Sequence, residues 1–442
     1  MKKTKKISLI LICILIIAAL PGCTNPNPGG VTEGEMYIMN LTAADLLSAR
    51  EEGQNPDTQK AAKGANDFAF KLSALLAEES GDDNLVCSPF SVWLPLAALL
   101  NATDDANKPA LLSALGASGI TEQDINEAAS RMLFDLTKEE NKEYMEDAHN
   151  PIKIANAVFV DHNVTLKKEF AQTFLDYFRG TAMNVDFSSA DAVDKVNKWA
   201  SDNTEGLITD VIQEFDPETI AAIANAIYYS DRWDWEFDSD KTEKGEFKGV
   251  SGTDQANFMI REGDAQIYYE DDKIQAMPLK FANGGGLYII LPRDGDATKC
   301  LSEMTSEYFE EIQNDAIQAT GKLLLPRFTI QGDVMNLSDS LKELGVPLFD
   351  SESAPLTGGI IEEDLKVWVS EAVQKAMIKV NEEGTTAAAV TVLAMAGAGM
   401  PMPTKPFEMN CDRPFVFVLY DWTYDGSTQV LFTGIVNQVT EE

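Results

Sequence analysis

One segment of this chain carries no charge, although the protein as a whole is strongly acidic. The sequence has 71 acidic and 35 basic side chains and a net charge of −36, but residues 385–404 contain neither kind. The first twelve of these residues, 385–396, are Thr, Ala, Val, Leu and Met without Gly or Pro. At roughly 3.3 Å per residue they can form a strand about 40 Å long. Gly and Pro residues from Gly397 to Pro403 then interrupt this β-compatible pattern.

Both faces of a strand over residues 385–396 would be uncharged, so either face could be buried. Three interpretations fit this composition. The segment is an ordinary central strand followed by a loop, a low-complexity surface segment prone to aggregation, or a strand that can either be exposed or join a sheet. Composition alone favours the ordinary strand.

The N-terminus has the pattern of an export signal. Four lysines among the first six residues precede an apolar run over residues 7–20, and Pro21, Gly22 and Cys23 follow. A run this short with such flanks is typical of a signal peptide over residues 1–22 rather than a spanning helix. The segment resembles bacterial lipoprotein precursors, which implies cleavage before Cys23 and its acylation, although Pro21 is unusual there. Cleavage without acylation would instead give a secreted protein.

The remaining chain divides into a tether and one large folded region. Residues 23–60 would hold the lipid-anchor Cys23, a flexible Pro-, Gly- and Asn-rich tether and an N-terminal extension, and residues 61–442 the folded domain. Loss of the four N-terminal lysines takes the net charge from −36 to about −40. So acidic a protein is not expected to bind nucleic acid or a heparin-like polyanion.

The sequence offers little for catalysis or metal binding. His149 and His162 are its only histidines, and it lacks HExxH, GxGxxG, Walker and GxSxG motifs. The cysteines after the N-terminal run are far apart and form no CxxC pair, so no zinc site or disulfide framework is expected. Cys87 and Cys411 lie in apolar stretches and are expected in the core. We therefore expect no enzyme activity, no metal and no cofactor.

Periodicity predicts helices in the first half and strands in the second. Helices are expected at 65–77, from Ser88-Pro89 onward, at 168–178 and at 190–203. Strands are expected at 154–161, 220–229, 286–292, 414–420 and 429–436. This order, without regular βαβ alternation, indicates a single α+β domain.

Six segments in order along the chain resemble the serpin family. Each is a weak match alone, but together they extend from about residue 61 to residue 438. They are Asn-Leu-Val-Cys-Ser-Pro-Phe-Ser (84–91), Thr-Glu-Gly-Leu-Ile (204–208), Ala-Asn-Ala-Ile-Tyr-Tyr-Ser-Asp-Arg-Trp (224–233), Leu-Pro-Arg-Phe (325–328), the segment 369–389, and Asp-Arg-Pro-Phe-Val-Phe (412–417).

The resemblance implies a serpin fold, with three β-sheets, about eight or nine helices and an exposed reactive-centre loop at about 384–405. It also implies a suicide inhibitor of serine proteases. In such inhibitors the native state is metastable, with a five-stranded sheet A slightly open. The protease cleaves the loop and becomes an acyl-enzyme, and the freed loop then inserts as a new central strand. The catalytic groups belong to the protease.

The hinge of the loop matches the inhibitory pattern. Glu382 and Glu383 are expected near the surface, and Gly384 is expected to supply backbone freedom. A charge at Thr385, the first side chain to enter the sheet, would oppose insertion. The small residues that follow would let insertion proceed: Thr386, Ala387, Ala388 and Ala389. A non-inhibitory binding or chaperone module with the same fold is the alternative.

The resemblance also implies a polar cluster that controls the opening of sheet A. Ser88, Ser91 and Asn225 would form it, with Gln374 where a histidine is common; Gln can still donate and accept. Trp233 would cap the point where the loop first enters, or be a core tryptophan, or both.

The scissile bond follows from counting along the loop. Counting from Gly384 gives Ala398–Gly399, whereas counting back from Arg413-Pro414 gives a site near Pro403. We prefer the count from Gly384, because the inserted length must reach the opposite pole of the sheet.

The expected partner is a serine protease with a small apolar specificity pocket, elastase-like or subtilisin-like, because Ala398 is small. Met400 and Met395 are alternative sites and would favour chymotrypsin-like enzymes. Residues 385–404 contain no Arg or Lys, which argues against trypsin-like targets. We expect a monomer, held at the membrane by its lipid anchor. An enzyme or solute-binding lipoprotein would instead require a cluster of titratable residues in a deep pocket.

Overall fold

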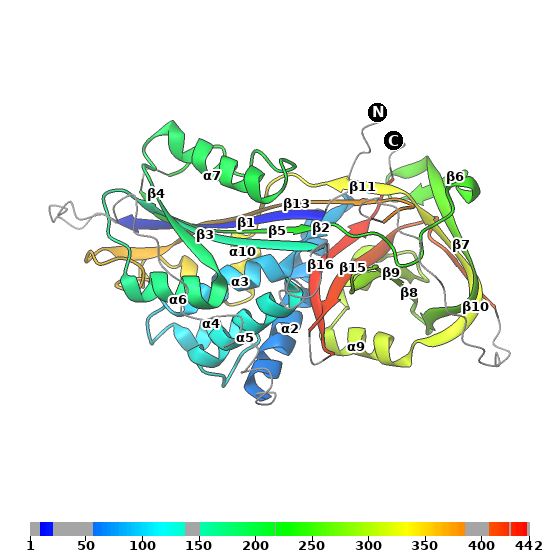
Figure 1. Cartoon of the computed structure of the whole chain (residues 1–442), viewed down its shortest axis with the longest axis horizontal. Helices are drawn as coiled ribbons and strands as arrows, with labels where there is room; N and C mark the ends of the chain where they lie inside the picture. Colours follow the sequence, from blue (N-terminus) through cyan, green and yellow to red (C-terminus); the bar gives the residue numbers. More distant parts are fainter. Residues whose placement is uncertain are drawn as a thin grey trace, which may run out of the picture.

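The computed structural model describes residues 9–20, 56–137, 151–216, 218–384, 406–423 and 426–439. Figure 1 shows a long sheet A with helices on both sides and two further sheets at one end. The arrangement confirms the expected α+β class with three sheets. None of the described helices has the length and apolar character needed to cross a membrane.

Nine α-helices occur in the described residues. They are α2 (Pro56–Ser80), α3 (Pro89–Leu100), α4 (Lys108–Ala114), α5 (Glu122–Leu136), α6 (Lys168–Phe178), α7 (Ala190–Asn203), α8 (Ala297–Ser302), α9 (Ser306–Asp315) and α10 (Ser338–Glu343). Helices α6 and α7 have the predicted bounds, and α3 begins at the predicted proline. The side chain of Ser88 caps α3 by accepting the backbone N–H of Ser91.

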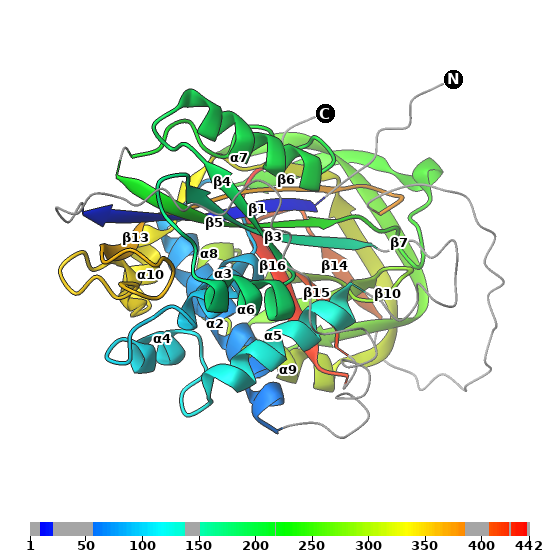
Figure 2. The same ribbon diagram turned by 60° about the vertical axis from the view of Figure 1, so that its left-hand side comes forward.

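Sheet A runs the length of the molecule. Its order is β11 (Phe328–Gln331), β13 (Lys366–Val380), β1 (Leu9–Leu20), β5 (Thr219–Tyr229), β3 (Ile152–Asp161) and β4 (Gly180–Val185), and β12 (Met335–Asn336) also pairs with β13. Figures 1 and 2 show β1 at the centre of this sheet. The expected five-stranded, slightly open sheet A is therefore wrong for this structure, because β1 fills the position between β5 and β13.

Two apolar layers cover sheet A, which explains why all eleven residues of β5 are buried. Alternate residues of β5 belong to different clusters: Ala222, Ala224 and Ala226 pack in the layer that includes α7, and Ile223 and Ile227 in the main core. In Figure 1, α7 lies over one face of the sheet and α3, α5 and α6 lie below the other. A strand buried on both faces is a continuous apolar run, as the sequence of β5 is.

The two smaller sheets share one long strand, β7 (Gly252–Glu270). Sheet B contains β8 (Ile274–Lys280), β9 (Gly286–Pro292), β15 (Phe415–Trp422), β16 (Thr428–Val436) and β2 (Leu85–Cys87). Sheet C contains β6 (Glu243–Gly249), β10 (Ile317–Pro326) and β14 (Phe407–Asn410) on the other part of β7. The strand β9 has the predicted bounds, and the strands predicted at 414–420 and 429–436 are β15 and β16.

Cys87 and Cys411 are buried, as predicted. Burial raises the pKa of the Cys87 thiol to about 11 and also raises that of Cys411, so both remain protonated at neutral pH.

Candidate functional site

The hinge begins where β13 ends, at Val380. The next residues form a tight turn in which Asn381 and Gly384 form a β-bridge, and Gly384 also bridges Arg232. Gly384 has φ +99°, and a Cβ there would lie 2.4 Å from the backbone N of Trp233. Both the left-handed backbone and the close approach therefore require glycine at this position.

Glu382 is anchored inside the hinge rather than near the surface, which corrects the prediction. Glu382 is 5% exposed. Both carboxylate oxygens accept from Arg327 Nε at 2.8 Å, and Thr242 Oγ1 donates to Oε1 at 2.5 Å. Burial alone raises the pKa of the Glu382 carboxyl, but hydrogen bonds from Arg327 and Thr242 outweigh it, so this pKa is lowered overall. Glu383 is exposed, as predicted.

The sequence did not predict Arg327 as the partner of Glu382, because the two residues are 55 positions apart in the chain. A signal was present, because Arg327 lies within the Leu-Pro-Arg-Phe segment at 325–328. An arginine between strands β10 and β11 of an acidic protein is expected to pair with a carboxylate, but the neighbouring residues do not identify which carboxylate.

Trp233 connects β5 to the hinge. Its indole Nε1–H donates to Asn381 O at 2.9 Å, and its backbone N–H donates to Glu383 O at 3.2 Å. The ring is 1% exposed and stacks on Phe281 with centroids 4.8 Å apart. Trp233 is therefore a core side chain and a hinge contact at once.

The predicted polar cluster is divided in two by β1. Gln374 accepts from the Ser88 N–H at 3.2 Å, donates to Ser88 O at 3.0 Å and lies 3.4 Å from Ser91 Oγ. Across the sheet, Asn225 Nδ2 donates to Asn156 Oδ1 at 2.8 Å. Asn225 Oδ1 is buried without a hydrogen-bond partner in the described part of the chain. The structure thus brings three predicted residues together and leaves Asn225 apart from them.

One residue of β1 occupies the position between the two halves of this cluster. In the backbone ladders, Cys13 is opposite Gln374 on β13 and opposite Asn225 on β5. If β1 were absent and the two strands paired directly, Gln374 and Asn225 would face each other across one ladder. The amide of Gln374 could then donate to the oxygen of Asn225 that now lacks a partner, in exchange for its longer hydrogen bond of 3.4 Å to Ser91 Oγ.

The site that β1 fills begins at the hinge end of β13 and extends to the far end of sheet A. The strand Leu9–Leu20 is antiparallel to both neighbours. It starts opposite Tyr229 on β5 and beside Met377 on β13, and it ends beside Thr219 and Lys366. A segment that turned back after the hinge would run in the same direction.

Several predicted residues lie outside the described residues. They are Cys23, the hinge residues Thr385, Thr386, Ala387, Ala388 and Ala389, and the candidate cleavage positions Met395, Ala398, Gly399 and Met400. The hinge residues that the structure describes are Glu382, Glu383 and Gly384.

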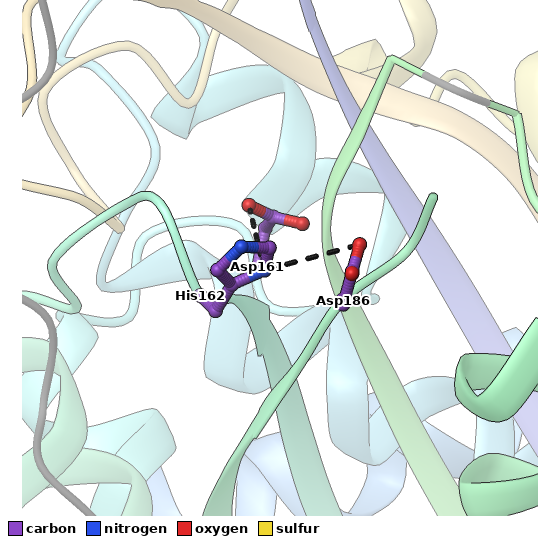
Figure 3. A group of neighbouring side chains, drawn as sticks. All are labelled: Asp161, His162 and Asp186. Carbon is purple, nitrogen blue, oxygen red and sulfur yellow. Dashed lines mark ion pairs between the residues drawn. The ribbon is translucent and has the colours of Figure 1, made fainter. Parts of the chain in front are cut away.

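A histidine with two carboxylates lies at the ends of β3 and β4, and Figure 3 shows its imidazole directed toward both. His162 Nδ1 is 3.8 Å from Asp161 Oδ1 and 3.9 Å from Asp186 Oδ1. The side chains of His162 and Asp186 are about half exposed. Both carboxylates already accept hydrogen bonds from neighbouring residues. Asp161 accepts from the Asn163 N–H, and Asp186 accepts from the Ser188 hydroxyl. The hydrogen bond from Ser188 lowers the pKa of the Asp186 carboxyl.

This cluster does not provide the deep titratable pocket that an enzyme would need. A surface pocket of about 530 Å³ lies elsewhere, between α2, α9 and the connection from β15 to β16. Its lining includes Lys63 and Glu310, which form a surface ion pair at 3.8 Å, and no histidine. Among the described residues, neither place combines a nucleophile, a base and a stabilising donor.

Comparisons with known proteins agree on the family. A family model described as "Serpin (serine protease inhibitor)" matches residues 63–439. Serpin-ZXA of Oryza sativa subsp. japonica is 30% identical over 84% of this chain and 95% of its own length. Alpha-1-antitrypsin-like protein GS55-MS of Ictidomys tridecemlineatus is 26% identical over 89% and 92%.

Solved structures share the fold. The thermophilic serpin tengpin in its native state superposes with a TM-score of 0.72 at 23% identity, covering 88% of this chain and 95% of that one. AtSerpin1 of Arabidopsis, in its native stressed conformation, also gives a TM-score of 0.72, at 24% identity. With a family model that matches most of the chain and relatives matched over nearly their full length, this chain belongs to the serpin family.

Proposed function

We propose that the mature chain inhibits serine proteases by inserting its cleaved reactive-centre loop into sheet A. One observation carries this proposal: sheet A holds an antiparallel twelve-residue strand between β5 and β13, directly beside the hinge. The uncharged segment that follows Gly384, residues 385–396, has the same length. Its small and apolar side chains suit a strand with apolar layers on both faces.

The reaction begins with the protease. Its serine oxygen attacks the carbonyl carbon of Ala398, the bond to the nitrogen of Gly399 breaks, and that nitrogen leaves as an amine after taking a proton from the protease. The protease stays joined to Ala398 by an ester. Residues 385–396 then pair with β5 and β13, which carries the ester about 40 Å from the hinge end to the far end of the sheet.

The backbone provides part of the driving force, because insertion replaces a single ladder between β5 and β13 by two ladders, one on each side of the inserted strand. The hinge residues of this chain set the starting point. Gly384 turns the chain at Trp233, and the Glu382–Arg327 pair holds the preceding residues in place. A charged side chain at Thr385 would be desolvated at the first step and would stop insertion there.

The test is a covalent-complex assay with residues 23–442. We expect incubation with pancreatic elastase or subtilisin to give a complex that survives a denaturing gel, and the released C-terminal fragment to begin at Gly399. Thr385→Arg should convert the inhibitor into a substrate, whereas Thr404→Arg, which adds the same charge beyond the inserted segment, should still form the complex. Cleavage of the unsubstituted chain without a complex would refute inhibition and favour a non-inhibitory binding module.

We also propose that Cys23 is acylated and holds a monomeric inhibitor at the outer face of the membrane. The support is the lysine-rich start, the short apolar run and Cys23 directly after it. Expression with a fatty-acid analogue should label the unsubstituted chain and leave Cys23→Ser unlabelled and released, with Cys300→Ser as the control. Equal labelling of all three would contradict acylation at this cysteine.

A further inference from the structure

The occupant of the insertion site in this structure is the chain's own N-terminal apolar segment. Leu9–Leu20 pairs with β13 from Met377 to Lys366 and with β5 from Tyr229 to Thr219. The blue strand β1 lies between these two strands in both views of Figures 1 and 2. Its twelve residues equal in number the uncharged loop segment 385–396, and its direction is the one that the loop would take.

Two strands cannot hold this position at once. Each backbone N–H and C=O on the facing edges of β5 and β13 can join only one ladder, so a strand already paired along the site excludes another. The sequence of Leu9–Leu20 is aliphatic apart from Cys13, whereas the loop segment contains three threonines and several alanines. The N-terminal segment is thus the more apolar of the two candidates for a position between two apolar layers.

The competition is intramolecular. Residues 21–55 connect β1 to α2, and their 35 residues can span far more than the length of the sheet, roughly 110 Å when extended. The segment therefore reaches the site at a high effective concentration in every chain that retains it.

We propose that Leu9–Leu20 blocks the insertion site in any chain that folds before its N-terminus is removed, so that such a chain cannot insert its loop. Hydrolysis of the bond between Gly22 and Cys23 before folding leaves the site free. The apolar run thus has a second use beside export, because a precursor that folds inside the producing cell would be unable to trap that cell's own proteases. This inference rests on the proposed inhibitory function for its consequence, but the occupancy of the site can be tested without it.

The experiment compares the full chain 1–442 with residues 23–442, both made by cell-free synthesis so that the N-terminus is retained. Hydrogen exchange of backbone amides in β5 and β13 reports occupancy. We expect those amides that face the site to exchange about 100-fold more slowly in the full chain, because β5 and β13 paired directly in a slightly open sheet separate more readily than when β1 lies between them. We also expect its unfolding midpoint to be higher by about 10 °C.

A second arm tests exclusion directly. Limited cleavage within residues 385–404 should raise the unfolding midpoint of residues 23–442, because the freed loop inserts, and should leave that of the full chain unchanged. Ile14→Asp, which places a charge in the middle of β1, should make the full chain behave like 23–442. Ile7→Asp, which adds the same charge outside Leu9–Leu20, should not.

The outcomes separate this inference from the proposed function. Equal exchange in the two chains, or loop insertion in the cleaved full chain, overturns the inference even if 23–442 inhibits elastase. Slow exchange in the full chain, together with reversal by Ile14→Asp, supports occupancy even if neither chain forms a covalent complex, and in that case only the inhibitory function fails.

Discussion

The two strands that border the insertion site differ in how their polar groups are satisfied. On β13, Gln374 exchanges hydrogen bonds with Ser88 at the start of α3 and lies within reach of Ser91. On β5, Thr219 Oγ1 and Asn225 Oδ1 are both buried without a partner in the described structure. Unsatisfied buried oxygens destabilise a structure. Replacing β1 by a strand that donates hydrogen bonds to these oxygens would therefore stabilise β5 more than β13.

The difference indicates that β13 is the fixed border. It is held at its middle by α3 and at its end by the Glu382–Arg327 pair and the turn at Gly384. Asn225 of β5 is opposite Cys13 of β1 in the backbone ladder, and not opposite a residue of β13. We expect four substitution experiments to show whether β13 is more firmly held than β5.

The largest effect is expected at Glu382. Glu382→Lys leaves Arg327 without its carboxylate and adds a like charge, so we expect a loss of about 3 kcal/mol in the free energy of unfolding, at the low end for a buried pair because Arg327 is partly exposed. Glu383→Lys makes the same change on the neighbouring exposed residue and should alter stability by less than about 0.5 kcal/mol. Denaturant unfolding measures both, and equal losses would mean that the hinge is not anchored through Glu382.

The next effect concerns the turn at the end of β13. Gly384→Ala and Gly345→Ala both place a side chain at positive φ, +99° and +83°. Only the first would also meet backbone atoms of Trp233 and Arg232, since nothing lies within 4 Å of a Cβ at Gly345. We expect Gly345→Ala to lower the free energy of unfolding by about 1 kcal/mol and Gly384→Ala by about 2 kcal/mol. A loss at Gly384→Ala no larger than at Gly345→Ala would show that the hinge can move away from Trp233 and Arg232 at little cost.

The third experiment compares the borders directly. Gln374→Met removes the hydrogen bonds to Ser88 at similar volume and should lower the free energy of unfolding by about 1–2 kcal/mol. A double-mutant cycle with Asn225→Ala should give a coupling near zero in the full chain, where β1 separates the two residues, and about 1 kcal/mol in residues 23–442. Coupling of the same size in both chains would contradict the separation by β1.

The smallest effect is a dependence on pH. The pKa of Glu382 is lowered in the folded protein, so its contribution to stability is present above the unfolded pKa, about 4.3, and is lost as the pH falls through the folded value. The stability difference between the unsubstituted protein and Glu382→Gln should therefore shrink below about pH 4.3. A difference that stays constant from neutral pH to pH 3 would mean that the Arg327 pair does not favour the ionised form.

Much of the local structure could be predicted from the sequence. The bounds of α6, α7 and β9 and the proline start of α3 follow from periodicity and helix-start chemistry, and the resemblance implied the glycine at the hinge. The resemblance placed Gln374 beside Ser88 and Ser91. The prediction that Glu382 lies near the surface was wrong. Its partner Arg327 is distant in sequence, and two consecutive acidic residues without a visible partner are normally expected to be exposed.

Which segments of this protein can be strands follows from the order of its residues, since alternation and an uncharged apolar run are properties of neighbouring residues. That order did not determine which strand occupies the centre of sheet A. Residues 9–20 and 385–396 are both twelve-residue candidates for it. The occupant is set by long-range pairing, because backbone hydrogen bonds do not distinguish one strand from another and the choice depends on which segment reaches the edges of β5 and β13.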